Sequence, residues 1–178
     1  MSVNCDPDDD GLTLIELIVS LLVSTIVLVG ISTVLVNAWI AQADVTSTSQ
    51  ATTRGQLIST AVERAMRNAR DFKVEGTDGG ELWVWTTLGG TRECQGFFLA
   101  DGQARLTVNS GPMPLSATWP DWEQDVAQST TPVQDFFIDN GDSVDYAFDI
   151  ITDSAPVRFE GTAASRFSGT GGTNPCWS

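Results

Sequence analysis

Apolar residues form one long, uninterrupted run near the start of the chain. No charged residue occurs between Glu16 and Asp44, and most side chains from 17 to 40 are apolar. As an α-helix rising about 1.5 Å per residue, this stretch would be about 40 Å long. The hydrocarbon core of a bilayer is about 30 Å thick. The pattern therefore predicts a helix that is long enough to cross a membrane once.

Helical periodicity returns after a polar stretch at 42–53, which predicts a weaker part of the same helix. From Gln56 onward, apolar residues recur at intervals of three and four and so line one face. These residues are Leu57, Ile58, Ala61, Val62, Ala65, Met66 and Ala69. We expect the helix to end near Asp71, ahead of a glycine-rich stretch. One long helix is thus predicted, apolar all round in its first half and amphipathic in its second.

Beyond Gly80 the pattern changes to the short alternating runs that are typical of strands. Two turn signals, Asp101-Gly102 and Asn140-Gly141, indicate hairpins. The proline-rich stretch 109–135 is predicted to be a long loop with one short helical turn. Strands are predicted at 81–87, 94–100, 104–108, 136–138, 144–151 and 157–160. The fold class is therefore α+β, with one long N-terminal helix packed on an antiparallel β-sheet.

Composition excludes several functions. The chain has no histidine, which removes histidine-dependent triads and zinc sites, and no catalytic motif or cofactor site is expected. The formal net charge of −14 disfavours direct nucleic-acid binding. A basic patch is conceivable only where Arg64, Arg67, Arg70 and Lys73 cluster. We interpret these four as the solvated face of the helix.

The residues Gly11-Leu12-Thr13-Leu14-Ile15-Glu16, followed by the apolar run, resemble the processing site of type IV pilins and type II secretion pseudopilins. In that family a prepilin peptidase cuts after the glycine and methylates the new amine. The resemblance implies that Gly11 ends the leader and that Leu12 becomes the N-methylated terminus. It also implies that Thr13 and Glu16 take part in assembly, with Glu16 as the buried carboxylate. Glu16 as an ordinary acidic residue at a helix N-terminus is the alternative.

The resemblance implies a division into a leader at 1–11, a membrane and assembly half of the helix at 12–40, and an exported head at 41–178. The protein would cross the cell membrane once and become extracellular in a filament. Its partners would be other pilin or pseudopilin subunits and the prepilin peptidase.

A shorter stretch, 61–69, is similar to the helix of J/W-type minor subunits and favours a minor pilin or pseudopilin that helps to initiate or cap assembly. The alternative is a membrane-anchored extracellular binding or adhesion module.

Cleavage would remove Cys5 and leave Cys94 and Cys176, both beyond the membrane, where disulfides persist. A bridge between them would attach the glycine-rich tail to the sheet, whereas the alternative is two free buried thiols.

Asp139, Asp142 and Asp145 surround Gly141 and are weak candidates for a calcium site. A hairpin turn with solvated acids explains the same residues. The aromatic residues that could form a binding platform, or else pack in the core, are Trp83, Trp85, Trp119, Trp122 and Trp177.

Overall fold

The structure is a computed structural model that describes residues 13–88, 90–100, 102–130, 132–167 and 174–177. The chain divides into two compact units, Met1–Ala43 and Asp44–Ser178. The predicted boundary after residue 11 lies outside the described residues. The predicted boundary at 40/41 falls inside a continuous helix, so the division into leader, membrane half and head stays a prediction.

The long helix α1 spans Leu14–Arg67. The polar stretch that was expected to be weak is helical throughout, and hydroxyls there bond within the helix: Thr52 and Thr53 each donate to the carbonyl four residues earlier. The end expected near Asp71 is wrong by about one turn. Asn68 N donates to the Ala65 carbonyl as the last turn tightens, and a strand begins at Ala69.

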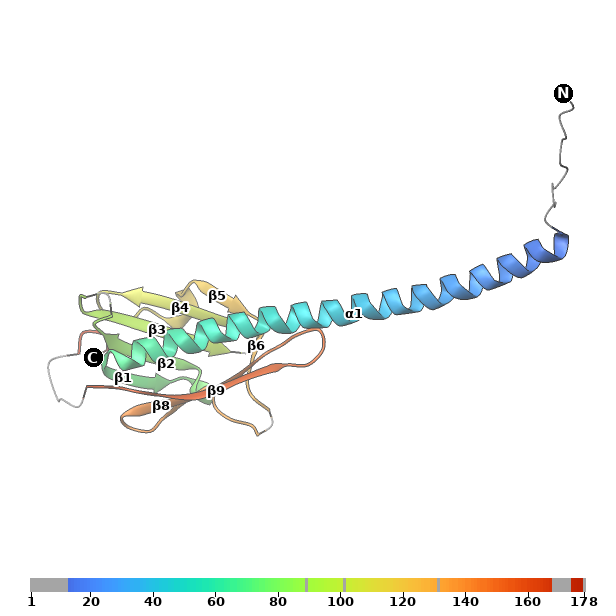
Figure 1. Ribbon diagram of the computed structural model, residues 1–178. Coiled ribbons are helices and arrows are strands. Elements are labelled where there is room, and N and C mark those ends of the chain that lie inside the picture. Colours follow the sequence, from blue (N-terminus) through green and yellow to red (C-terminus); the bar gives the residue numbers. More distant parts are fainter. Residues whose placement is uncertain (1–12, 89, 101, 131, 168–173, 178) are drawn as a thin grey trace, which may run out of the picture. The chain divides into compact units, whose positions relative to one another are not determined.

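Short strands and two 3-10 turns follow α1 (Figure 1). Their bounds are β1 Ala69–Glu75, η1 Thr77–Gly79, β2 Glu81–Thr86, β3 Glu93–Ala100, β4 Gln103–Asn109, η2 Ser116–Thr118, β5 Asp121–Gln124, β6 Val126–Ala127, β7 Phe137–Asp139, β8 Ser143–Ile150 and β9 Val157–Ala164. The predicted α+β class, with a long N-terminal helix on antiparallel sheets, is confirmed.

The strands of the described residues form two antiparallel sheets. The first has the order β1-β2-β3-β4-β5, and its register places Val84 opposite Gln95 and Phe97 opposite Leu106. In the second, β8 pairs with β9 on one side and with both β6 and β7 on the other. Sequence neighbours are paired in each sheet, so the topology is built largely from hairpins.

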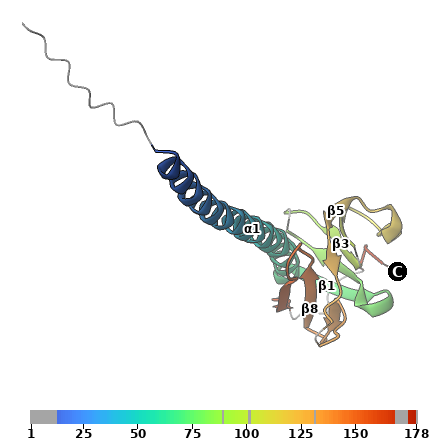
Figure 2. The ribbon, with the colours of Figure 1, turned by 90° about the vertical axis from the view of Figure 1, so that its right-hand side faces the viewer.

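The core of the head lies between α1 and the two sheets. Figures 1 and 2 both show the C-terminal part of α1 against the strands. Its buried residues recur at helical spacing: Ala51, Gly55, Ile58, Val62, Ala65 and Met66. They meet inward-facing side chains of both sheets, among them Leu82, Val84, Phe97, Leu99, Val144, Phe148 and Ile150. Four residues of the predicted amphipathic face, Ile58, Val62, Ala65 and Met66, therefore face the core, whereas Leu57 is 49 % exposed and Ala69 begins β1.

Gly55 allows α1 to approach β9 closely. A Cβ at this position would fall inside the ring of Phe159, which itself stacks on Phe148 with ring centroids 5.4 Å apart. A helix glycine costs about 1 kcal/mol relative to alanine. Here the Phe159 ring packs in the space that a side chain at residue 55 would otherwise occupy.

The outer face of the first sheet is covered by two segments without strands. Trp119 and Met113, from the loop between β4 and β5, lie directly over Gly96 of β3, where a Cβ would clash with both. The C-terminal segment 174–177 covers the neighbouring part, where Cys176 and Trp177 pack with Trp85. The first sheet is thus buried on both faces over much of its area.

Candidate functional site

The N-terminus of α1 contains the described part of the resemblance to the prepilin processing site. Thr13 precedes the helix, and its carbonyl accepts hydrogen bonds from the backbone N–H of Glu16 at 3.0 Å and of Leu17 at 3.2 Å. Thr13 is therefore the N-cap residue, and Glu16 lies in the first turn, where the helix dipole favours a negative charge. The predicted cleavage and methylation residues, Gly11 and Leu12, lie outside the described residues.

The apolar half of α1 exposes its side chains. Every residue from 13 to 46 is exposed, including Ile26 at 72 % and Val34 at 70 %. Exposed apolar surface of this extent is unfavourable in water and favourable in lipid. By length and composition, α1 is the one helix among the described residues that could cross a membrane.

Three hydroxyl groups in the apolar half of α1 donate hydrogen bonds within the helix. Thr25 and Ser32 donate to the carbonyl four residues earlier, and Thr33 donates to the Gly30 carbonyl, each at 2.8 Å. Such bonds remove the cost of placing a hydroxyl in hydrocarbon. Glu16 is then the one residue between Thr13 and Ala43 that carries a charge.

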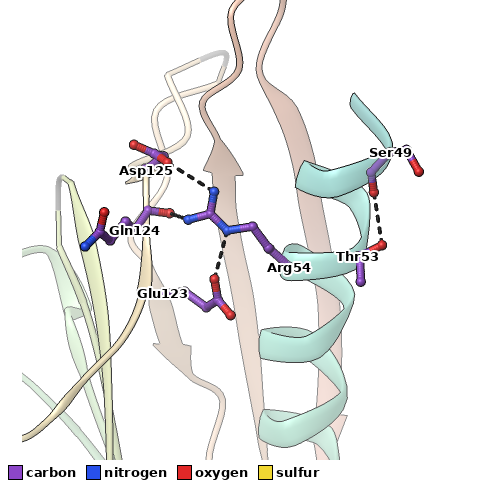
Figure 3. Close-up of polar contacts among 6 residues, drawn as sticks. All are labelled: Ser49, Thr53, Arg54, Glu123, Gln124 and Asp125. Atoms are coloured by element: carbon purple, nitrogen blue, oxygen red, sulfur yellow. Dashed lines mark hydrogen bonds and ion pairs between the residues drawn. The ribbon is translucent and has the colours of Figure 1, made fainter. Parts of the chain in front are cut away.

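Arg54 connects α1 to the end of the first sheet (Figure 3). Its guanidinium donates to Glu123 at 2.8 Å, to Asp125 at 3.1 Å and to the Gln124 carbonyl. These contacts raise the pKa of Arg54, chiefly through the hydrogen bond to Glu123. The sequence analysis did not identify this role, because the acceptors lie about 70 residues away in the chain and no local motif marks them.

Glu63 makes a second polar contact between α1 and a strand, in this case β8. Its carboxylate accepts a hydrogen bond from the Tyr146 hydroxyl at 2.9 Å and pairs with Arg67 at 2.8 Å. Burial, and then the hydrogen bond to Glu63, raise the pKa of Tyr146. The phenol therefore remains a neutral donor, and it joins α1 to β8.

The four basic residues that were interpreted as one solvated helix face lie on two elements. Arg64 and Arg67 are on α1 and exposed, whereas Arg70 and Lys73 are on β1. Arg67 and Lys73 pair with Glu63 and Glu75. The interpretation is wrong for the two strand residues, because the helix ends before them.

A disulfide joins Cys94 on β3 to Cys176 in the C-terminal segment. Both cysteines are buried, beside Trp85 and Trp177. The backbone N–H of Met113 also donates to the Cys176 carbonyl at 2.9 Å, which ties the tail to the covering loop. The predicted attachment of the tail to the sheet is therefore present, and the alternative of two free thiols is not.

The acids around Gly141 form a hairpin turn. Asp139 accepts the Gly141 N–H at 2.7 Å, and Asp145 accepts the Thr162 hydroxyl at 2.6 Å. Hydrogen bonds from Thr162 and then from Asn140 lower the pKa of Asp145. Within the described ranges, no three acidic or cysteine side chains gather in a way that could hold a metal ion. The structure therefore does not bring Asp139, Asp142 and Asp145 together as a calcium site.

The tryptophans do not form a common exposed surface. Trp85 and Trp119 are buried at 2 % and 3 % exposure. Trp83 and Trp177 are half-buried and contact each other edge to face at 6.3 Å, and Trp122 packs near Phe97. The core and packing interpretation explains all of these residues, so no observation favours a tryptophan binding platform.

Comparison with known families finds one match. Residues 8–32 match the family described as the prokaryotic N-terminal methylation motif. No curated protein and no solved structure matches the chain. The matched segment contains Gly11, Leu12, Thr13 and Glu16, and it is consistent with the type IV pilin and pseudopilin family. The motif and the apolar helix together indicate a membrane-anchored, single-pass, pilin-type structural subunit that a prepilin peptidase processes.

Proposed function

We propose that this protein is a minor pilin or a type II secretion pseudopilin that helps to initiate or cap an extracellular filament. After insertion in the membrane it is cleaved behind Gly11 and methylated on Leu12, and it then assembles beside other subunits. The observation that carries the proposal is Glu16: a carboxylate inside the matched motif, in the first turn of a helix that is otherwise uncharged up to Ala43.

The physical argument concerns how such a helix leaves lipid for a bundle of similar helices. Apolar packing gives little direction, since lipid tails are as apolar as leucine. A carboxylate at membrane depth costs at least a few kcal/mol when it has no partner. The amine that the same kind of cleavage creates at the N-terminus of a neighbouring subunit offers such a partner. Pairing relieves the desolvation cost and sets the axial stagger between subunits.

The test compares cleavage with assembly. Glu16→Gln is expected to leave cleavage behind Gly11 intact and to lower crosslinking to other pilin-type subunits at matched expression. Glu16→Asp should be intermediate because its carboxylate lies one methylene closer to the helix. Asp44→Asn, which removes the carboxylate at the other end of the uncharged stretch, is the matched control. If Glu16→Gln crosslinks as well as the unmodified chain, Glu16 is only a helix-terminal charge and the account of assembly is wrong.

Processing and abundance test the rest of the proposal. The mature chain should begin at N-methylated Leu12, which mass spectrometry of the N-terminal peptide decides. Met1 or Ser2 at the terminus of assembled protein would contradict the processing step.

A minor subunit should also be scarce in sheared filaments, while its deletion should sharply reduce their number. Quantitative proteomics that finds it dominant would overturn the minor role and leave the pilin-type assignment intact.

A further inference from the structure

A shallow groove of about 270 Å³ lies on the head between α1 and the first sheet. Leu57, Ala61 and Arg64 form its helix side, and Leu106 and Val108 of β4 form part of its sheet side. The volume is below the range of about 300–1,000 Å³ that is usual for small-molecule pockets. It suits one or two side chains from another protein better than a small-molecule ligand.

The apolar wall of this groove is open to solvent. Leu57 is 49 % exposed and Val108 is 54 % exposed, although the core residue Phe97 lines the same groove. Gln95, a polar side chain that is only 8 % exposed, also lines the groove. An inserted apolar side chain would remove Leu57 and Val108 from water without displacing the core.

Arg64 supplies an unbalanced positive charge at the same place. Its side chain makes no hydrogen bond or ion pair with any residue that the structure describes, whereas Arg54, Arg67, Arg105 and Arg158 each pair with a carboxylate. The chain as a whole is strongly acidic. Apolar surface and an uncompensated cation therefore coincide in one groove, and charge complementarity points to a partner that is apolar and acidic.

We propose that this groove docks a segment of a neighbouring pilin-type subunit that presents an apolar side chain with a carboxylate within about one helical turn of it. The proposal rests on the proposed function, which supplies the neighbour. The apolar side chain fills the space between α1 and β4, and the carboxylate pairs with Arg64. Because a minor subunit is scarce, the neighbour is a different polypeptide and not a second copy of this chain.

The test places the photo-crosslinker benzoylphenylalanine at Leu57 or at Val108 of the full-length chain in the source cells. Both positions are expected to crosslink to one segment of another pilin-type subunit, and mass spectrometry of the joined peptides should find Asp or Glu beside the attachment point. Val133, which is apolar and 75 % exposed but outside the groove, is the matched control position and should not crosslink to that segment.

Charge reversal tests the role of Arg64. Arg64→Glu should lower the crosslinking yield from Leu57 by about three- to tenfold, since it replaces an attraction with a repulsion. Arg64→Lys should retain most of the yield. Lys73→Glu makes the same change of charge on β1, outside the groove, and should have no effect. An unchanged yield with Arg64→Glu would overturn the proposal.

A crosslinker at Val29 in the apolar half of α1 separates this inference from the proposed function. If Val29 crosslinks to pilin-type subunits and the groove positions do not, the groove proposal fails while the proposed function stands. If Val29 also fails to crosslink to them, the proposed function fails with it. Groove crosslinks only to lipid, or only to a second copy of this chain, would likewise overturn the proposal.

Discussion

Reduction of the Cys94–Cys176 disulfide is expected to lower the free energy of unfolding of the head by about 4.5 kcal/mol. The two cysteines are 82 residues apart in the chain. In the chain-entropy model, opening a loop of that length returns about 15 cal/mol/K to the unfolded state, which gives about 4.5 kcal/mol at 25 °C. Measured losses for native disulfides are about 2–5 kcal/mol. A loss within that range would agree with the loop-closure argument.

Within the described part of the tail, residues 174–177, few other contacts could replace the bridge. Asn174 donates to Asp71 at 2.6 Å, and Met113 N–H donates to the Cys176 carbonyl. Trp177 adds an edge-to-face contact with Trp83. Single hydrogen bonds contribute a net of about 1 kcal/mol each, and an aromatic pair contributes a similar amount. These contacts cannot compensate for the loss of the bridge.

The assay is urea unfolding of the full-length protein in detergent, followed by tryptophan fluorescence, with and without a phosphine reductant. Reduction is carried out in the unfolded state, because the bond is buried, and free-thiol labelling confirms it. The dependence on urea should also steepen, since an uncrosslinked chain exposes more surface when it unfolds. Trp177→Ala, which keeps the bridge and removes a packing contact, is the control. If reduction changes the unfolding free energy by less than about 1 kcal/mol, tail packing and not loop closure holds this region, and the loop-length argument does not apply here.

Three further outcomes follow from local geometry. Gly96→Ala should lower the free energy of unfolding by about 1–3 kcal/mol, because the new methyl group overlaps Trp119, and unchanged urea unfolding would contradict this. Arg54→Ala should cost about 1–2 kcal/mol, since the partly buried Glu123 loses its partner, and hydrogen exchange should quicken in that turn of α1. The lowered pKa of Asp145 stabilises the fold above the carboxyl's unfolded pKa of about 3.9, and this stability is lost as the pH falls through the lower folded value. Asp145→Asn should therefore flatten the acid side of the stability–pH curve, and an unaltered curve would refute the assignment.

The elements that could be predicted from sequence are those with strong local signals. The apolar run and the amphipathic repeat determine α1, and the hairpin at Asn140-Gly141 connects β7 to β8 as its turn residues indicated. Strand β1 was missed because Ala69 continues the apolar face of the helix. The chain nevertheless leaves the helix there, since Phe72 pairs with Val84 on β2, and pairing between strands is not visible in a local window.

The structure of region 109–135 likewise could not be predicted fully from local sequence. It was predicted to be a long loop with one short helical turn because of its prolines. The turn is present as η2, but the region also contains the strands β5 and β6. Strand β5 forms only beside β4, where Ala104 pairs with Glu123, so its existence depends on tertiary context. Arg54 could not be assigned for a related reason, because its acceptors come from this same region. Glu16 was identified because its signal is a contiguous motif.

The two units of this chain differ in how much of their apolar surface they bury. This difference limits which residues can make specific contacts with a partner subunit. The head buries its core between α1 and two sheets, and a disulfide attaches its tail. The residues from Thr13 to Ala43 bury nothing within the chain and carry one charge, on Glu16. Lipid and neighbouring helices are equally good solvents for such a surface. Directional contacts must therefore come from few positions: the carboxylate of Glu16 in the membrane half, and in the head a site such as Arg64, where a charge and apolar surface remain without a partner in the described chain.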